Sequence, residues 1–223
     1  MQRQKKPIEK IFLETRPPEC VALSIGGCGI LTRALVGRHA MRYRESQSIA
    51  LAFAHVVVQA LGFSPSSERL STPQILVDAA DAVIDDPEHV FLLGTAWRYQ
   101  PEGVEICSVG SNSVLVFEQD TVREVIVPHT INELLKRRGQ EPEPKSRMQV
   151  THVLGSKRGQ ESCHTNDVRV ALIPWLPTTM IAVIEERLLA DAILEGTIPR
   201  NQLSSYIEMW EPPQRKTSIL ISW

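Results

Sequence analysis

The sequence has little of what marks nucleic-acid-binding, secreted or membrane-spanning proteins. Its 223 residues carry a formal net charge of -2, whereas nucleic-acid-binding domains are usually strongly basic. The longest apolar run, Ile49–Leu61, is broken by His55 and Gln59 and is shorter than the roughly 20 residues of a membrane span. Residues 1–10 are charged, and no apolar segment with a cleavage site follows them. We therefore expect no nucleic-acid partner, no membrane span and an intracellular, cytoplasmic location.

Cysteine is also scarce, with four residues at Cys20, Cys28, Cys107 and Cys163. A chain of this length forms a core without disulfides, so we expect free and mostly buried thiols. The length and a hydrophobic content of 43% favour one globular domain. We place a polar N-terminal arm at residues 1–18 and a single domain at residues 19–223.

The hydrophobic pattern predicts strands and helices in a mixed order. Strands are predicted at Cys20–Ile25, Val90–Arg98, Val104–Val109, Ser113–Glu118, Thr121–Val127, Val150–Gly155, Val168–Ile173, Met180–Ile184 and Thr217–Trp223. Helices are predicted at Ser46–Leu61, Thr72–Asp85, Thr130–Arg138, Arg187–Leu194 and Asn201–Trp210. Residues 30–46 give no clear prediction, and the four strands between residues 90 and 127 predict one antiparallel meander. The order indicates an α+β domain in which two packed antiparallel β-sheets are flanked by α-helices.

Several short motifs, taken in order, resemble those of the type 2C metal-dependent serine/threonine protein phosphatases. Val109–Phe117 is similar to the family's Val-Gly-Asp-Ser-Arg hairpin and the apolar strand after it. Val21–Gly27 resembles the family's Val-Ala-Asp-Gly-x-Gly-Gly motif, and Ser48-Ile49-Ala50 falls where the family's first long helix begins. Weaker similarities lie at Leu93–Ala96, Pro128–Thr130, Val153–Gly155, Met180–Leu188 and Thr217–Ile221. The resemblance covers about residues 19–223 and implies an α-β-β-α sandwich.

The acidic residues that the resemblance requires are missing. The family's reaction uses two divalent metals, and hard cations such as Mg²⁺ or Mn²⁺ bind carboxylate oxygens. The matched positions hold Leu23, Ser24, Ser111, Glu186 (followed by Arg187), Gln214 and Arg215. Glu186 is the one carboxylate among them, and the arginines would repel a divalent ion. We therefore expect no metal, no cofactor and no conventional phosphatase activity, which is the pattern of a pseudophosphatase.

The loss of the family's metal-binding aspartates favours a catalytically inactive protein-binding, scaffold or regulatory module. We expect its partner to be a kinase, a phosphoprotein or a subunit of a complex. One alternative is an enzyme with altered chemistry or residual phosphatase activity, which would use Glu186, Glu185, Asp191 or the Cys163-His164 pair. The other alternative is a structural subunit of a larger complex, with tryptophans as anchors. The candidate anchors are Trp97, Trp175, Trp210 and Trp223.

Basic residues and glycines mark candidate anion-binding or partner-binding positions. Gly26 and Gly27 could present backbone N–H groups to an anion, although a tight turn is the simpler interpretation. The cations that could add to such a site are Arg33, Arg38, Arg42 and Arg187. The run Lys136-Arg137-Arg138 could meet an acidic partner or simply form a solvated helix end.

Overall fold

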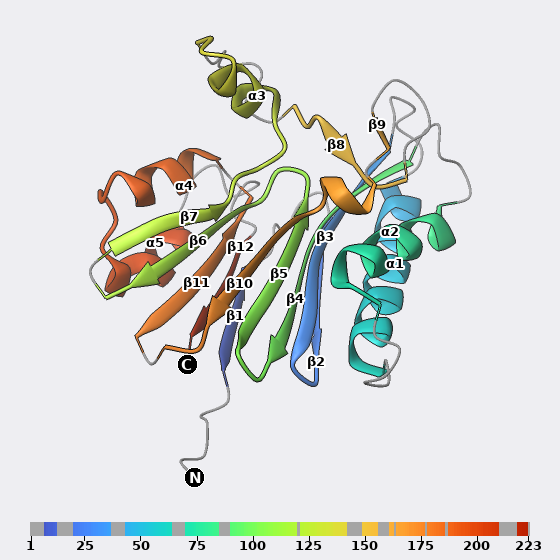
Figure 1. Cartoon of the computed structure of the whole chain (residues 1–223), viewed down its shortest axis with the longest axis horizontal. Coiled ribbons are helices and arrows are strands. Elements are labelled where there is room, and N and C mark those ends of the chain that lie inside the picture. The colour runs from blue at the N-terminus through green and yellow to red at the C-terminus, as the bar shows by residue number, and fades with distance from the viewer. Residues whose placement is uncertain are drawn as a thin grey trace.

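Two five-stranded antiparallel sheets lie face to face at the centre of the structure (Figure 1). The computed structural model describes residues 7–12, 20–36, 43–63, 70–84, 90–119, 121–141, 149–155, 161–162, 164–176, 178–185, 187–209 and 218–222. One sheet has the order β1-β12-β11-β6-β7, with bounds Ile8–Phe12, Ser218–Ser222, Thr179–Ile184, Ser113–Glu118 and Thr121–Ile126. The other has the order β10-β5-β4-β3-β2, with bounds Arg169–Pro174, Gly103–Val109, Val90–Gln100, Cys28–Val36 and Cys20–Ile25.

Alternating side chains on these strands build a core between the two sheets. Strand residues point to opposite faces in turn, so each inner strand buries one set of apolar side chains against the other sheet. Trp97 is the largest of them and is fully buried. The set includes Leu31, Trp97, Val104, Ile106, Val114, Val116, Ile126, Ile173, Ile181, Val183, Ile219 and Ile221.

Helices cover the two outer faces of the sandwich (Figure 1). On the β2-β3-β4 side lie α1 (Tyr43–Phe63) and α2 (Thr72–Val83), and on the other side lie α4 (Arg187–Leu194) and α5 (Leu203–Met209). The Ser71 side chain caps α2 by accepting a hydrogen bond from the Gln74 N–H at 3.3 Å. The predicted α+β sandwich is therefore confirmed. None of the described helices combines the length and the apolar character needed to span a bilayer.

One short helix, α3 (Ile131–Arg137), stands at one end of the sandwich, apart from both helix layers (Figure 1). The backbone before and in its first turn is joined to the segment at residues 149–151 by an antiparallel bridge between Thr130 and Val150. Two hydrogen bonds form this bridge, one from the Ile131 N–H to the Gln149 carbonyl and one from the Thr151 N–H to the His129 carbonyl. The remaining short elements are β8 (His152–Val153), β9 (Glu161–Ser162), η2 (Thr165–Asp167) and η3 (Arg200–Gln202).

The N-terminal residues correct one sequence prediction. Ile8–Phe12, which the sequence assigns to a polar arm, forms β1 and pairs with β12. Glu9 is one of the charged residues that make this segment look polar. Its carboxylate accepts hydrogen bonds from Trp97 Nε1 at 3.1 Å and from the Tyr99 hydroxyl. Burial and the Glu9 carboxylate together raise the pKa of Tyr99. The described part of the arm is therefore an edge strand tied to the opposite sheet.

The predicted four-strand meander is also wrong. It is two hairpins, β4–β5 and β6–β7, which belong to different sheets. Gly110, at a φ of 111°, lies where the chain crosses from one sheet to the other. A Cβ atom there would lie 2.8 Å from the Leu93 side chain, so glycine is required for the close approach as well as for the turn. The crossing places Ser111 and Asn112 at the end of the core between the sheets.

Candidate functional site

One end of the core between the sheets is closed by a buried ion pair. Arg33 lies in β3 of one sheet, and Glu185 directly follows β11 of the other. Arg33 Nε lies 2.9 Å from Glu185 Oε1, and Nη2 donates to Oε2 at 2.9 Å. The two side chains are only 18% and 7% exposed. Contact with both carboxylate oxygens is the strongest geometry of an arginine–carboxylate pair, and here it joins the two sheets.

Cys20 completes this cluster from the neighbouring strand. It pairs with Arg33 in the β2–β3 ladder, and Arg33 Nε donates to its Sγ at 3.0 Å. The space that remains is a cavity of about 10 Å³, which is the room of a single water molecule. The described residues that line it are Cys20, Leu31, Thr32, Arg33, Leu93, Ser111, Asn112 and Glu185.

Ser111 and Arg33 are the candidate residues that the structure brings together. Ser111 is buried in the turn between β5 and β6. The next residue fixes that turn, because Asn112 Nδ2 donates to Thr95 Oγ1 at 2.8 Å and the Thr95 hydroxyl lies 2.7 Å from that of Ser108. These buried hydrogen bonds fix the turn that carries Ser111, and the sequence analysis assigned no role to Asn112 or Ser108.

Leu23 and Ser24 do not reach this end of the core. Leu23 pairs with Ile30 and packs with the apolar cluster beneath α1, while Ser24 is exposed. The motif match took β2 as the strand before the first long helix, but β3 lies between β2 and α1. The strand directly before the first long helix is therefore β3, and the position at this end of the core belongs to β3 rather than to β2. Arg33 is the β3 residue that faces the opposite sheet there.

Gly26 and Gly27 form the turn of the β2–β3 hairpin, with φ values of 61° and 95°. They lie at the end of β3 away from Arg33, so the anion site predicted from these glycines and Arg33 is not assembled. Other predicted positions lie outside the described residues, where they stay predictions. These are Glu186, Gln214, Arg215, Arg38, Arg42, Cys163, Trp210 and Trp223.

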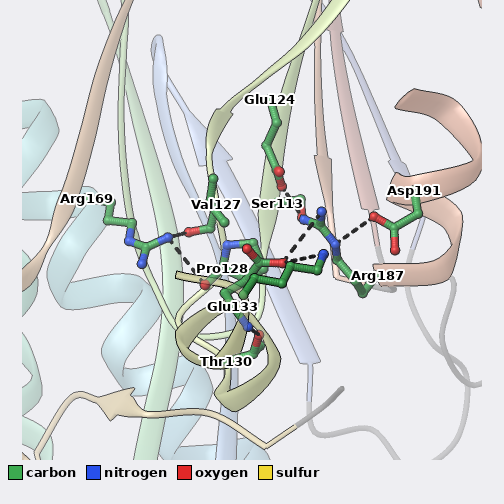
Figure 2. A network of polar contacts seen from close by, with 10 residues as sticks. Ser113, Glu124, Val127, Pro128, Thr130, Glu133, Arg169, Arg187 and Asp191 are labelled. Atoms are coloured by element: carbon green, nitrogen blue, oxygen red, sulfur yellow. Dashed lines mark hydrogen bonds and ion pairs between the residues drawn. The ribbon is translucent and has the colours of Figure 1, made fainter. Parts of the chain in front are cut away.

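Arg187, at the start of α4, lies among carboxylates rather than on an open surface (Figure 2). Its Nη1 lies 2.5 Å from Glu124 Oε1 and donates to Ser113 Oγ at 3.1 Å. Its Nε lies 2.9 Å from Asp191 Oδ1, and its Nη2 lies 3.7 Å from Glu133 Oε1. Burial acts to lower the pKa of Arg187, but the three carboxylates more than offset it and the pKa is raised. Asp191, which the sequence analysis named as a possible acid or base, is therefore a carboxylate that is already held in an ion pair.

His129 is a structural residue of the same region. Its Nδ1 accepts the Gly110 N–H at 3.4 Å, so the neutral ring carries its proton on Nε2, which lies 3.1 Å from the Asp167 carbonyl. Its ring lies 4.9 Å from that of His152. Burial, with the neighbouring charges of Arg169 and His152, lowers the pKa of His129 to about 3. The imidazole therefore stays neutral and holds the turn at Gly110.

The described cysteines are free and buried, as the sequence predicts. They are Cys20, Cys28 and Cys107, and burial is the main cause that raises the pKa of both Cys28 and Cys107. A raised pKa keeps a thiol protonated, and the protonated form is a poor nucleophile and metal ligand.

A pair of divalent metals does not fit the described site. Among the residues that the structure describes, no three histidine, cysteine, aspartate or glutamate side chains gather in a metal-binding group. More directly, Glu185 is already bound through both oxygens, and the guanidinium of Arg33 lies where a metal would have to approach it. The chemistry of this donor set is that of an internal ion pair.

No protein-family model matches the sequence, and no curated protein is similar to it. Several solved structures match nearly its whole length. The phosphatase PstP/Ppp of Mycobacterium tuberculosis has a TM-score of 0.68 at 12% identity, with 97% of both chains covered. The fold is that of the PPM serine/threonine phosphatases.

Two further solved structures have the same fold. The catalytic domain of PstP in complex with two manganese ions has a TM-score of 0.63 at 12% identity, over 97% of this chain and 96% of that one. PppA, a key regulatory component of T6SS in Pseudomonas aeruginosa, has a TM-score of 0.59 at 13% identity, over 97% and 95% of the two chains. At such identities the likeness extends to the fold alone.

Proposed function

We propose that this chain is a phosphatase-fold protein that does not hydrolyse phosphoesters and serves as a protein-binding, scaffold or regulatory module. The observation that carries the proposal is the Arg33–Glu185 ion pair at the end of the core between the sheets. Ser111, which stands where the resembled family has an aspartate, lines the same small cavity. The charge at this end of the fold is thus balanced from within.

Electrostatics make a metal here unfavourable. A dication about 5 Å from the guanidinium would be repelled by about 7 kcal/mol at an effective dielectric constant of 20. Binding would also require Glu185 to leave Arg33, which uncovers a buried cation. Hard cations offset such costs with several carboxylates, and Ser111 and Cys20 supply none. Arg33 therefore supports the absence of two-metal hydrolysis more strongly than the missing aspartates do by themselves.

In a binding module, a partner would occupy the surface where a phosphatase of this fold binds its substrate. The solved relative PppA is a regulatory component of a larger system, which favours a regulatory module over an enzyme with new chemistry. The partner that we propose is a kinase, a phosphoprotein or a subunit of a complex. A phosphorylated partner that is not dephosphorylated stays bound, which suits a scaffold.

The test is an assay of p-nitrophenyl phosphate hydrolysis by the full chain with millimolar Mn²⁺ or Mg²⁺. We expect turnover no faster than in a protein-free blank, and no metal-dependent rise in the melting temperature, because a ligand stabilises only the state that it binds. Glu185→Gln is the diagnostic variant, and Glu102→Gln, in the exposed β4–β5 turn, is its matched control. Mn²⁺-dependent turnover that Glu185→Gln abolishes and Glu102→Gln retains would disprove the proposal.

A further inference from the structure

An open pocket of about 680 Å³ lies on the outer face of the β1-β12-β11-β6-β7 sheet, at the end where β6 turns into β7 and β11 begins (Figure 1). This volume falls within the range of small-molecule sites, which is about 300–1,000 Å³. Met180 lies near the start of β11, whereas Glu185 directly follows its end. The pocket and the Arg33–Glu185 pair are therefore at opposite ends of that strand.

Apolar side chains from the sheet and from the helix layer form the floor of the pocket. Met180 is paired with Phe117 of β6 in the strand ladder, and both belong to one apolar cluster with Ile193 of α4 and Ile198. These four side chains are between 1% and 9% exposed, so only a part of each faces the pocket. The floor is thus a small apolar surface held by a packed core.

A tight helix end builds one wall of the pocket. Gly196, at a φ of 75°, follows α4 and lets the Thr197 N–H donate to the Ala192 carbonyl at 3.1 Å, which is the hydrogen bond of a Schellman motif. The turn leads Ile198 into the apolar cluster and places Arg200 two residues further along the wall. Backbone hydrogen bonds therefore fix the position of this wall relative to α4.

Arg200 is the one charged side chain among the described residues that line the pocket. It is partly buried, and no ion pair joins it to a carboxylate in the part of the chain that the structure describes. Glu195, the nearest carboxylate in sequence, is exposed just after α4 and does not line the pocket. The other polar side chains of the lining are neutral, and they are Gln119, Thr121, Asn201 and Ser222.

We propose that this pocket binds a small amphipathic carboxylate, with its apolar body on the floor and its carboxylate on the Arg200 guanidinium. Charge complementarity favours this ligand class, because a guanidinium can donate two parallel hydrogen bonds to a carboxylate. A standard protein interface buries about 800 Å² on each partner, whereas a pocket of this volume suits a single small molecule. The site goes beyond the function proposed above, and it holds whether or not the chain hydrolyses phosphoesters.

The experiment compares three ligands on the full chain at constant ionic strength. Hexanoate carries both the charge and the apolar body, acetate carries only the charge, and hexanamide carries only the body. Binding is followed by the methyl chemical shifts of Met180, Ile193 and Ile198, with Ile75 of α2, in the other helix layer, as the internal control. We expect hexanoate to saturate the first three shifts and to bind about tenfold more tightly than either of the other ligands.

Variants at Arg200 separate the charge from the apolar floor. Arg200→Gln should weaken hexanoate binding about tenfold, which is the loss of one charge-assisted hydrogen bond, and should leave hexanamide binding unchanged. Arg200→Lys keeps the charge and should retain most of the affinity for hexanoate. Arg138→Gln removes an exposed arginine that follows α3, and as the matched control it should bind hexanoate as the wild type does.

Several results would overturn the proposal. These are methyl shifts that hexanoate does not saturate, acetate or hexanamide binding as tightly as hexanoate, and hexanoate affinity unchanged in Arg200→Gln. Methyl shifts that move with protein concentration in ligand-free samples would overturn it in favour of a second copy of the chain. If Arg200→Gln does not fold, the comparison of the three ligands on the wild type decides the question. Mn²⁺-dependent hydrolysis would refute the inactive module without altering this titration.

Discussion

Removing one partner of the Arg33–Glu185 pair should cost nearly as much stability as removing both. Glu185→Gln keeps the shape of the side chain but leaves a guanidinium that is 18% exposed without its counter-ion. Loss of one member of a buried ion pair typically costs about 3–5 kcal/mol. Because Arg33 keeps its contact with Cys20 and some access to water, we expect about 3 kcal/mol. Arg33→Gln should cost about the same, and the double variant also about 3 kcal/mol, which gives a coupling energy of about 3 kcal/mol.

The assay is urea unfolding of the wild type, the two single variants and the double variant, followed by tryptophan fluorescence at neutral pH. A constant m-value across the four proteins shows that they unfold from equally compact states. The matched cycle at Arg123 and Glu118, whose side chains are 57% and 34% exposed, should couple by less than about 1 kcal/mol. Single-variant costs at Arg33 and Glu185 that add to the double within about 0.5 kcal/mol would refute a buried, neutralising pair.

Two further predictions concern stability. His129 stays neutral in the fold down to a pH of about 3, whereas an unfolded histidine takes up a proton near pH 6.5. Stability from this group should therefore be full well above pH 6.5 and should fall on acidification, by about 1.4 kcal/mol at pH 5.5. Urea midpoints measured against pH should fall less steeply in His129→Asn than in the wild type, and His55→Asn, on the exposed face of α1, is the control. Gly29→Ala would place a Cβ 2.3 Å from the Trp97 ring and should cost about 3 kcal/mol in the same unfolding assay. Gly62→Ala meets its nearest atom at 3.7 Å and should not destabilise, and equal effects of the two would contradict the close packing at Trp97.

Elements with a clear local pattern were predictable, whereas the pairing of strands was not. The continuous apolar run Met180–Ile184 matches β11 to within one residue, and the predicted helix Arg187–Leu194 matches α4. Sheet membership depends on contacts between residues far apart in sequence, so four consecutive strands looked like one meander. The strand β3 was missed because Arg33 interrupts its apolar run, and the partner of that charge lies 152 positions away.

Local sequence patterns identified only part of the candidate site. Ser111 was found because its Gly-Ser-Asn turn is a local motif. Arg33 was named for a different role, with Gly26 and Gly27, because neighbours in sequence suggested a shared loop. The β2–β3 hairpin instead sends the glycines to one end of the strand and Arg33 to the other. No local signal marks Glu185 as its partner, since a Glu-Glu pair before a helix is an ordinary solvated helix start.

The end of the fold that carries Arg33 has a charge balance opposite to that of a dication site. Two metal ions need an excess of carboxylates facing a common space. Here each of the described carboxylates that lie near the end of the core is already paired with a cation. Glu185 is paired with Arg33, whereas Glu124, Glu133 and Asp191 surround Arg187, and Lys136 is a second cation beside Glu133. Carboxylates neutralised in this way would have to give up their cations before they could bind two dications.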